Sequence, residues 1–206
     1  MNKHFRQLKK IKVLGYPFAG GQGKTGVEKT PTWLQNQSWF KQLSQRNSHI
    51  EYEEIQVTSP NSNLSQPEDY LTSEQKVCEY MGTCSSEEET IEAKNILNVM
   101  SSSMNLRNQT FKALKEGYYP IVLGGDHSQA IGSIAGMKKF MPDTKIIWID
   151  AHIDANTPES SPSRNAHGMP LAYLTGQVNQ HKHWTCVDMR KDLCYFGIRS
   201  YEDDEA

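Results

Sequence analysis

Four side chains that can bind a divalent metal ion occur in two short motifs. Asp150, His152 and Asp154 lie two residues apart directly after an apolar run, and His127 follows another apolar run in the sequence Gly-Gly-Asp-His-Ser. If the extended geometry of the first run persists, the two carboxylates and the imidazole share one face, because alternate side chains of a strand point to the same side. Neighbouring parallel strands lie about 5 Å apart. The spacing therefore predicts that all four side chains converge.

A bound divalent cation would explain this concentration of acidic groups. Two ionised carboxylates at a partly buried strand end repel each other unless a cation compensates them. Carboxylate oxygen and imidazole nitrogen without a thiolate favour Mn²⁺, with zinc and iron as alternatives. The structural interpretation is that Asp126 or Asp150 caps a helix and that the histidines are ordinary loop residues. That interpretation suits each residue alone but does not explain why four occur together.

A third histidine lies in a loop that could adjoin the same site. His167 stands in the sequence Ser-Arg-Asn-Ala-His-Gly-Met-Pro. A histidine at such a loop-to-helix junction can transfer protons near neutral pH without binding the metal, although on its own it would more often be an ordinary loop residue. Asn156, Ser163 and Asn165 add neutral hydrogen-bonding groups that could hold a substrate carboxylate.

An α/β framework is expected to position these motifs. Short apolar runs predict strands, and longer amphipathic stretches predict helices. The expected strands are 11–14, 50–57, 119–123, 145–149 and 193–198, and the expected helices are 91–114, 130–140 and 171–174. Strands that alternate with helices indicate a doubly wound parallel sheet. Ligands of such sheets bind beyond the carboxyl ends of the strands, where both metal-binding motifs lie.

Several segments give local predictions. A glycine-rich loop spans 15–26, and Thr30-Pro31 is typical of an N-cap followed by the first residue of a helix. The long helix is expected to follow the acidic cluster 87–89 and to break at Ser101–Ser103. The polar residues 58–74 predict a surface loop of low order. The expected apolar stripe of the helix after Thr30 consists of Trp33, Leu34, Phe40 and Leu43.

The composition excludes several classes of partner. The chain has 206 residues, with 22 Lys+Arg against 24 Asp+Glu and a formal charge of −2. A surface for nucleic acid or an anionic membrane would need a clear basic excess. No segment resembles a signal peptide or a membrane span. The four cysteines form no Cys-x-x-Cys pair, which is typical of reduced thiols and argues against structural zinc. We therefore expect a cytoplasmic protein that binds a small molecule or another protein.

The apolar share leaves two kinds of domain open. It is about 38% when glycine is counted and tyrosine is not, against roughly 45–50% for typical soluble domains. The chain is then either a complete domain with long polar loops or part of a larger domain whose other core strands are absent.

Together, the motifs resemble the ureohydrolase family and, within it, the arginases. Agmatinase-like members share the metal-binding motifs but not the stretch 156–165, so the arginase branch is favoured. The resemblance covers patches of nearly the whole chain and implies a three-layer α/β/α fold. The segments that carry it are Gly15–Phe18, Gly26–Pro31, Gly124–Ser128, Trp148–Pro158 and His167–Pro170.

The resemblance implies two Mn²⁺ ions in each complete active site. His127 would bind one ion, His152 would bind the other, Asp150 would bridge both, and Asp154 would complete the first ion's ligands on this chain. A water between the ions would lose its proton near neutral pH and attack the guanidinium carbon of L-arginine. The products would be L-ornithine and urea, as in arginine metabolism and the urea cycle.

The resemblance also implies roles for residues around the metal ions. His167 would carry a proton to the leaving amine. Members of the family commonly form trimers or hexamers, so a homo-oligomer is expected of a full-length protein. The α-carboxylate of the substrate would contact Asn156, Ser163 and Asn165, and its α-amino group would lie near Glu202 and Glu205.

The sequence also departs from the family pattern. Arg164 stands where glycine is usual, which could alter substrate selectivity, and Glu202 stands where aspartate is usual. The family's later Asp-x-Asp-x-x-Asp-Pro segment, which supplies two further ligands, has no counterpart in these 206 residues. We therefore expect 1–206 to be a single incomplete domain that lacks its C-terminal strands and turns over little substrate alone. Its unpaired apolar sheet edge would lower its solubility.

Three alternatives remain. Gly23-Lys24-Thr25 resembles part of a phosphate-binding loop, but Phe18 stands where that motif requires glycine, and Pro31 would interrupt its helix. The chain could instead be a catalytically inactive arginase-like fragment or pseudoenzyme. Finally, it could act on agmatine or another guanidino compound, and substitution of Asn165 would test this.

Overall fold

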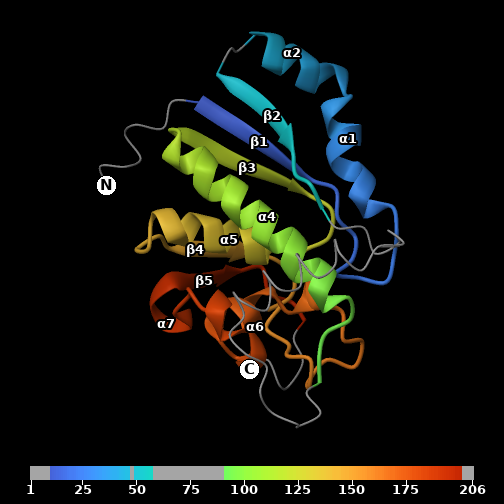
Figure 1. Cartoon of the computed structure of the whole chain (residues 1–206), viewed down its shortest axis with the longest axis vertical. Coiled ribbons are helices and arrows are strands. Elements are labelled where there is room, and N and C mark those ends of the chain that lie inside the picture. The colour runs from blue at the N-terminus through green and yellow to red at the C-terminus, as the bar shows by residue number, and fades with distance from the viewer. Residues whose placement is uncertain (1–9, 47–48, 58–90, 201–206) are drawn as a thin grey trace, which may run out of the picture.

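Parallel strands of the described residues form two sheets (Figure 1). This computed structural model describes residues 10–46, 49–57 and 91–200; the first sheet has the order β2-β1-β3, and the second pairs β4 with β5. Every pairing is parallel, and Val13 of β1 lies opposite both Tyr52 and Ile121. The expected α/β class is thus confirmed. The strands are β1 Lys10–Tyr16, β2 Ile50–Glu54, β3 Tyr118–Gly124, β4 Ile146–Ile149 and β5 Leu193–Phe196.

Helices connect the strands and pack on both faces of the first sheet. Leu14 of β1 faces α4, whereas Gly15 of β1 and Tyr52 of β2 face Pro31 of α1 and Phe40 of α2. The longest, α4, packs across β1 and β3 beside α5, as Figure 1 shows. A side chain at Gly136 of α5 would place its Cβ 2.5 Å from the Arg107 carbonyl oxygen, so glycine permits the close approach of the two helices. The helices are α1 Thr30–Gln35, α2 Ser38–Arg46, α4 Ile96–Lys115, α5 Gln129–Phe140, α6 Pro170–Thr175 and α7 Met189–Asp192.

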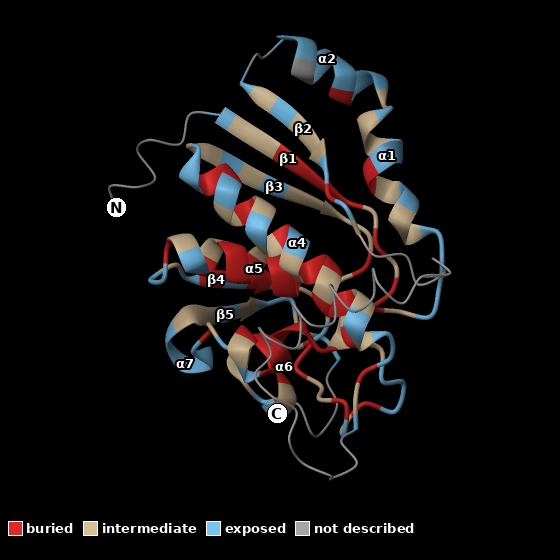
Figure 2. Ribbon diagram, viewed as in Figure 1, coloured by how far each residue is buried: buried red, intermediate tan, exposed pale blue. Residues whose placement is uncertain are grey.

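A single hydrophobic core joins the two sheets. Leu14 of β1, Leu106 of α4, Ile131 of α5, Trp148 of β4 and Leu171 of α6 are all buried in it. Figure 2 shows buried residues concentrated on α5 and α6, which pack against each other. The core therefore holds the carboxyl ends of β3 and β4 in a fixed relation even though no hydrogen bond pairs these two strands among the described residues.

The predicted break at Ser101–Ser103 is wrong. The helix α4 is continuous from Ile96 to Lys115, and Ser102 and Ser103 are buried. A Cβ at Gly132 of α5 would collide with the Ser103 carbonyl oxygen. The serines are therefore small residues at a tight contact between helices and not a signal for a turn. The acidic cluster 87–89 and the polar segment 58–74 lie outside the described residues.

The predicted apolar stripe after Thr30 is also wrong. Thr30 is already helical, Pro31 follows as the second helical residue, and the chain divides into α1 and α2 between Gln35 and Ser38. Trp33 is 61% exposed and Leu43 is 47% exposed, whereas Phe40 is buried. Because the helix is interrupted, spacing along the sequence no longer places these side chains on one face.

One face of the second sheet carries exposed apolar side chains. Ile147 and Ile149 of β4 are 70% and 75% exposed, and Phe196 of β5 is 70% exposed. They alternate with the core residues Ile146 and Trp148, as expected for a strand with one face packed. The expected low solubility stays a prediction. Among the described helices, none is long and apolar enough to span a membrane.

Candidate functional site

The carboxyl ends of β3 and β4 bring three of the predicted ligands together. His127 Nδ1 lies 3.1 Å from Asp154 Oδ2 and 3.7 Å from Asp150 Oδ2. One potential ligand atom from each residue falls within 4.8 Å of the other two. The His127 ring packs against Trp148, with ring centroids 5.1 Å apart. Two strands from different sheets therefore deliver an imidazole and two carboxylates to one point.

A turn, and not a continued strand, places Asp150 and Asp154. The strand β4 ends at Ile149, and Asp154 has a left-handed backbone with a φ of 57°. The Asp150 carboxylate accepts the His152 N–H at 2.9 Å, which folds the chain back on itself. The prediction that an extended chain would place these side chains on one face was therefore wrong. Both carboxylates nevertheless reach the cluster, because the turn brings them there.

His152 lies beside the cluster and not within it. Its side chain is 63% exposed, and its Nδ1 lies 3.3 Å from Asp150 Oδ1. It lines the same cavity as the other three predicted ligands. Of the four side chains predicted to converge, His127, Asp150 and Asp154 form one compact group. The fourth, His152, lies next to Asp150 on the solvent side.

The charges of the cluster shift two pKa values in opposite directions. Burial by itself would lower the pKa of His127, but the Asp154 carboxylate and the charges of Asp150 and Asp126 outweigh it and raise that pKa. Burial opposes ionisation of Asp150, yet the His152 N–H and the His127 imidazole lower its pKa overall. Both shifts favour the charged forms of these two side chains.

The donor set fits a divalent metal ion. Asp154 is buried, and its Oδ2 makes no hydrogen bond despite its ion-pair distance from His127. A buried carboxylate oxygen without a hydrogen bond is costly unless a cation compensates it. Because the other donors are a second carboxylate and an imidazole, the cluster suits an ion such as Mn²⁺ or Zn²⁺.

A cavity of about 390 Å³ opens over the cluster, and most of the predicted substrate contacts line it. Ser163 and Asn165 lie on one loop and are joined by a bond from the Asn165 N–H to Ser163 Oγ at 3.3 Å. Asn156 accepts a hydrogen bond from Ser160. Glu202 and Glu205 lie outside the described residues. The lining residues are His127, Asp150, His152, Asp154, Asn156, Ser161, Ser163, Asn165, His167, Gly168 and Ser200.

Two lining serines were missed by the sequence reasoning. Ser161 Oγ accepts the Arg164 N–H at 3.1 Å, and Ser200 follows β5 and donates its N–H to the Ala151 carbonyl oxygen. The rule that ligands bind beyond strand ends could have identified Ser200. No sequence signal separates Ser161 from the other serines of its loop.

Arg164 has an unusual backbone and does not line the cavity. Its φ is 53°, a region that favours glycine, and its side chain is exposed. Its carbonyl oxygen accepts the Lys94 N–H at 2.8 Å. The usual glycine at this position thus matches a requirement of the backbone, and the expected influence of Arg164 on selectivity stays a prediction.

The phosphate-binding alternative finds no support in the local structure. Gly23, Lys24 and Gly26 are exposed, and the chain enters a short 3-10 helix at Val27–Lys29 before α1. A phosphate-binding loop instead leads its lysine directly into a helix.

Comparison with known proteins relates this chain to arginases in both sequence and structure. Residues 9–206 match the Arginase family. The arginase of Eremothecium gossypii is 32% identical over 98% of this chain and 47% of its own length, and human arginase-1 is 30% identical over 95% of this chain and 56% of its own length. The crystal structure of Entamoeba histolytica arginase with L-ornithine superposes with a TM-score of 0.73 at 31% identity, covering 97% of this chain and 61% of that one. The chain thus spans about half the length of the curated relatives that it matches.

Proposed function

Because the chain belongs to the arginase family, we propose that it carries the first metal-binding part of an amidine hydrolase that converts L-arginine and water to L-ornithine and urea. The observation that carries this proposal is the cluster of His127, Asp150 and Asp154 at the base of a cavity lined by hydrogen-bonding side chains. The same proposal includes a cytoplasmic location and assembly of the full-length protein into a trimer or hexamer.

In the proposed mechanism, this chain's residues hold the metal ions and the substrate. His127 and Asp154 would bind one Mn²⁺, His152 the other, and Asp150 both. Bound manganese supplies a water that ionises near neutral pH. His167, which lines the same cavity, would give a proton to the leaving amine of ornithine. Asn156, Ser163 and Asn165 would orient the substrate through its carboxylate.

Metal binding tests the first half of the proposal. The purified 206-residue chain should retain at least one Mn²⁺ after gel filtration, measured by mass spectrometry of the metal. Asp154→Asn should lose it because the variant removes the buried carboxylate charge, whereas Asp143→Asn, at an exposed site remote from the cluster, should not. Retention of clearly less than one ion per wild-type chain would favour a metal-free fragment.

Turnover tests the second half. We expect the chain alone to release little urea, because two ligands of the family pattern are not among its residues. A chimaera that continues after Ala206 with the part of the Eremothecium gossypii arginase that follows the matched residues should release urea from L-arginine, and His167→Asn should slow it by about 100-fold or more. A chimaera that retains manganese but is inactive on arginine contradicts the proposed reaction.

Substrate choice is tested in the same chimaera. If arginine is recognised through its carboxylate, Asn165→Ala should lower kcat/KM for arginine and leave that for agmatine, which has no carboxylate, nearly unchanged. Equal effects on both substrates, or a wild-type preference for agmatine, would favour the alternative of another guanidino substrate.

A further inference from the structure

Asp126 precedes the proposed ligand His127 but faces away from the cavity. Its side chain is buried and is not among the cavity-lining residues. One carboxylate oxygen accepts the Gly21 N–H at 2.8 Å, and the other accepts the Ser128 N–H at 2.9 Å. The Asp126 N–H in turn donates to the Phe18 carbonyl oxygen at 2.8 Å. Asp126 thus fastens the glycine-rich loop after β1 to the turn that carries His127.

The glycine-rich loop also contacts the other side of the cavity. The Gly21 carbonyl oxygen accepts the His167 N–H at 2.9 Å. The backbone of Gly21 therefore makes both contacts: its N–H donates to Asp126, and its carbonyl oxygen accepts from His167. Two successive hydrogen bonds join the residue beside the metal ligand to the backbone of His167.

The close approach of Asp126 explains why glycine occupies position 21. A Cβ there would lie 2.6 Å from an Asp126 carboxylate oxygen and 2.8 Å from Ser128 Oγ, distances that a real Cβ does not adopt. The neighbouring Gly20 carbonyl oxygen accepts a hydrogen bond from Asn95 at 3.2 Å, so the loop is held from a second direction. The glycine-rich loop, which links Asp126 to His167 in space, is therefore tightly constrained.

We propose that Asp126 is a positioning residue that acts on His167 through Gly21. The carboxylate fixes Gly21, the Gly21 carbonyl oxygen fixes the His167 backbone, and the His167 ring is thereby held over the cluster formed by His127. The proposal rests on the proposed function in assigning His167 the proton transfer. A misplacement of about 1 Å can reduce a catalytic rate about 100-fold, so this link would set the turnover number and leave metal binding unchanged.

Amide hydrogen exchange tests the link in the 206-residue chain without any need for activity. In Asp126→Asn the amides of Gly21 and His167 should exchange about 5-fold faster, which corresponds to the roughly 1 kcal/mol that one hydrogen bond contributes. Exchange within α6 and the Mn²⁺ content should stay as in the wild type. Asp188→Asn is the matched control, because Asp188 also accepts two backbone N–H groups, from Arg190 and Lys191, but far along the chain from this loop.

A double-mutant cycle in the chimaera separates positioning from general support of the fold. Asp126→Asn should lower kcat about 10-fold or more with little change in KM, and it should have no further effect when His167→Asn is already present. An equal loss in the His167→Asn background, or unchanged exchange of the His167 amide, overturns the proposal.

If Asp126→Asn does not fold, Gly21→Ala disturbs the same bond from the other partner and is judged by the same two readouts. If the chimaera is inactive while the exchange link is present, the proposed reaction fails and the structural link stands.

Discussion

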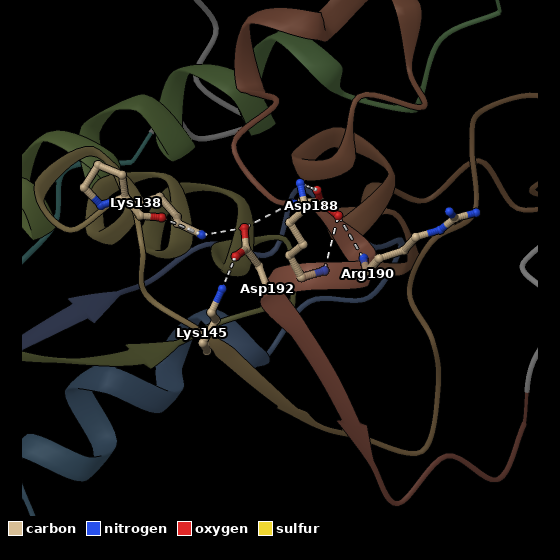
Figure 3. Close-up of polar contacts among 7 residues, drawn as sticks. Lys138, Lys145, Asp188, Arg190 and Asp192 are labelled. Carbon is tan, nitrogen blue, oxygen red and sulfur yellow. Dashed lines mark hydrogen bonds and ion pairs between the residues drawn. The ribbon is translucent and has the colours of Figure 1, made fainter. Parts of the chain in front are cut away.

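Two clusters of charged side chains lie at opposite ends of β4 and β5, and they are built differently. At the amino end, Asp192 accepts a hydrogen bond from Lys138 at 2.7 Å and from Lys145 at 3.0 Å (Figure 3). At the carboxyl end, the charged partners of Asp150 and Asp154 among the described residues are imidazoles, His127 for both carboxylates and His152 for Asp150. No lysine or arginine belongs to the described residues that line the cavity there. The first cluster supplies its own cations, and the second does not.

The two clusters also differ in backbone geometry. Asp154 and Arg164, both near the cavity, have left-handed backbones, and the described residues of the Lys138–Asp192 network have ordinary φ values. Strained backbone and uncompensated acid occur together at the carboxyl end. Charge compensation within the chain is typical of a structural cluster, and the lack of a lysine or arginine at the carboxyl end supports the proposed metal site.

Removing Asp192 should have the largest effect on stability. The Lys138 side chain is only 3% exposed, and Asp192→Ala would leave this buried ammonium without its carboxylate. We expect a loss of about 3 kcal/mol in the free energy of unfolding, measured by urea titration. Lys145→Met is the matched control, because Lys145 is 64% exposed and its ion pair should contribute less than about 1 kcal/mol. A similar loss in both variants would contradict the structural role of the buried pair.

Adding Mn²⁺ should stabilise the protein only through the carboxyl-end cluster. At a free concentration of 100 times Kd, a ligand that binds only the folded state adds about 2.7 kcal/mol to the free energy of unfolding. Asp154→Asn should abolish this increment, and a chelator should reverse it in the wild type. Asp192→Asn should lower stability but retain the full increment. Loss of the Mn²⁺ response in Asp192→Asn would show that the two clusters are not independent.

Acid should weaken the amino-end cluster. Hydrogen bonds from Lys138 and then Lys145 hold the pKa of Asp192 far below its ordinary value. Since the folded pKa is below the unfolded value of about 3.9, this contribution to stability is complete above about pH 5 and is lost as the pH falls toward the folded pKa. Between pH 7 and pH 3, the wild type should lose at most about 1 kcal/mol more than Asp192→Asn in urea titrations. A constant difference between the two proteins would contradict the ion pair.

The sequence predicted the framework better than it predicted the details of the site. The apolar runs gave the strands β3 and β4 and the helix α5 to within about one residue, because these segments are the core of the fold. The residue types at positions 127, 150, 152 and 154 predicted a metal site, and the structure brings three of these side chains together; the metal itself stays a prediction. The turn at Asp154 was not predictable, because aspartate adopts a left-handed backbone only occasionally and its position in the sequence does not show where.

Contacts between distant segments explain the remaining misses. Lys138 and Asp192 are 54 residues apart, and no pattern in either segment indicates that they meet. Ser101–Ser103 of α4 predicted a break in the helix, because serine side chains compete for the hydrogen bonds of the helix. In the structure these small residues instead allow Gly132 of α5 to approach closely. The bond from His167 to Gly21 likewise depends on how two loops approach and has no signature in either one.

Replacing Arg164 with glycine should have the smallest effect and would sharpen the comparison of backbone strain. A left-handed backbone costs a side-chain-bearing residue about 1–2 kcal/mol, and the greater freedom of glycine in the unfolded chain offsets part of that gain. We therefore expect Arg164→Gly to raise the free energy of unfolding by about 0.5 kcal/mol. Arg164→Ala is the control, because alanine keeps the Cβ and hence the strain, so its stability should stay near that of the wild type. If both variants were equally stabilised, the long side chain of Arg164, and not its backbone, would be the source of strain at the carboxyl end.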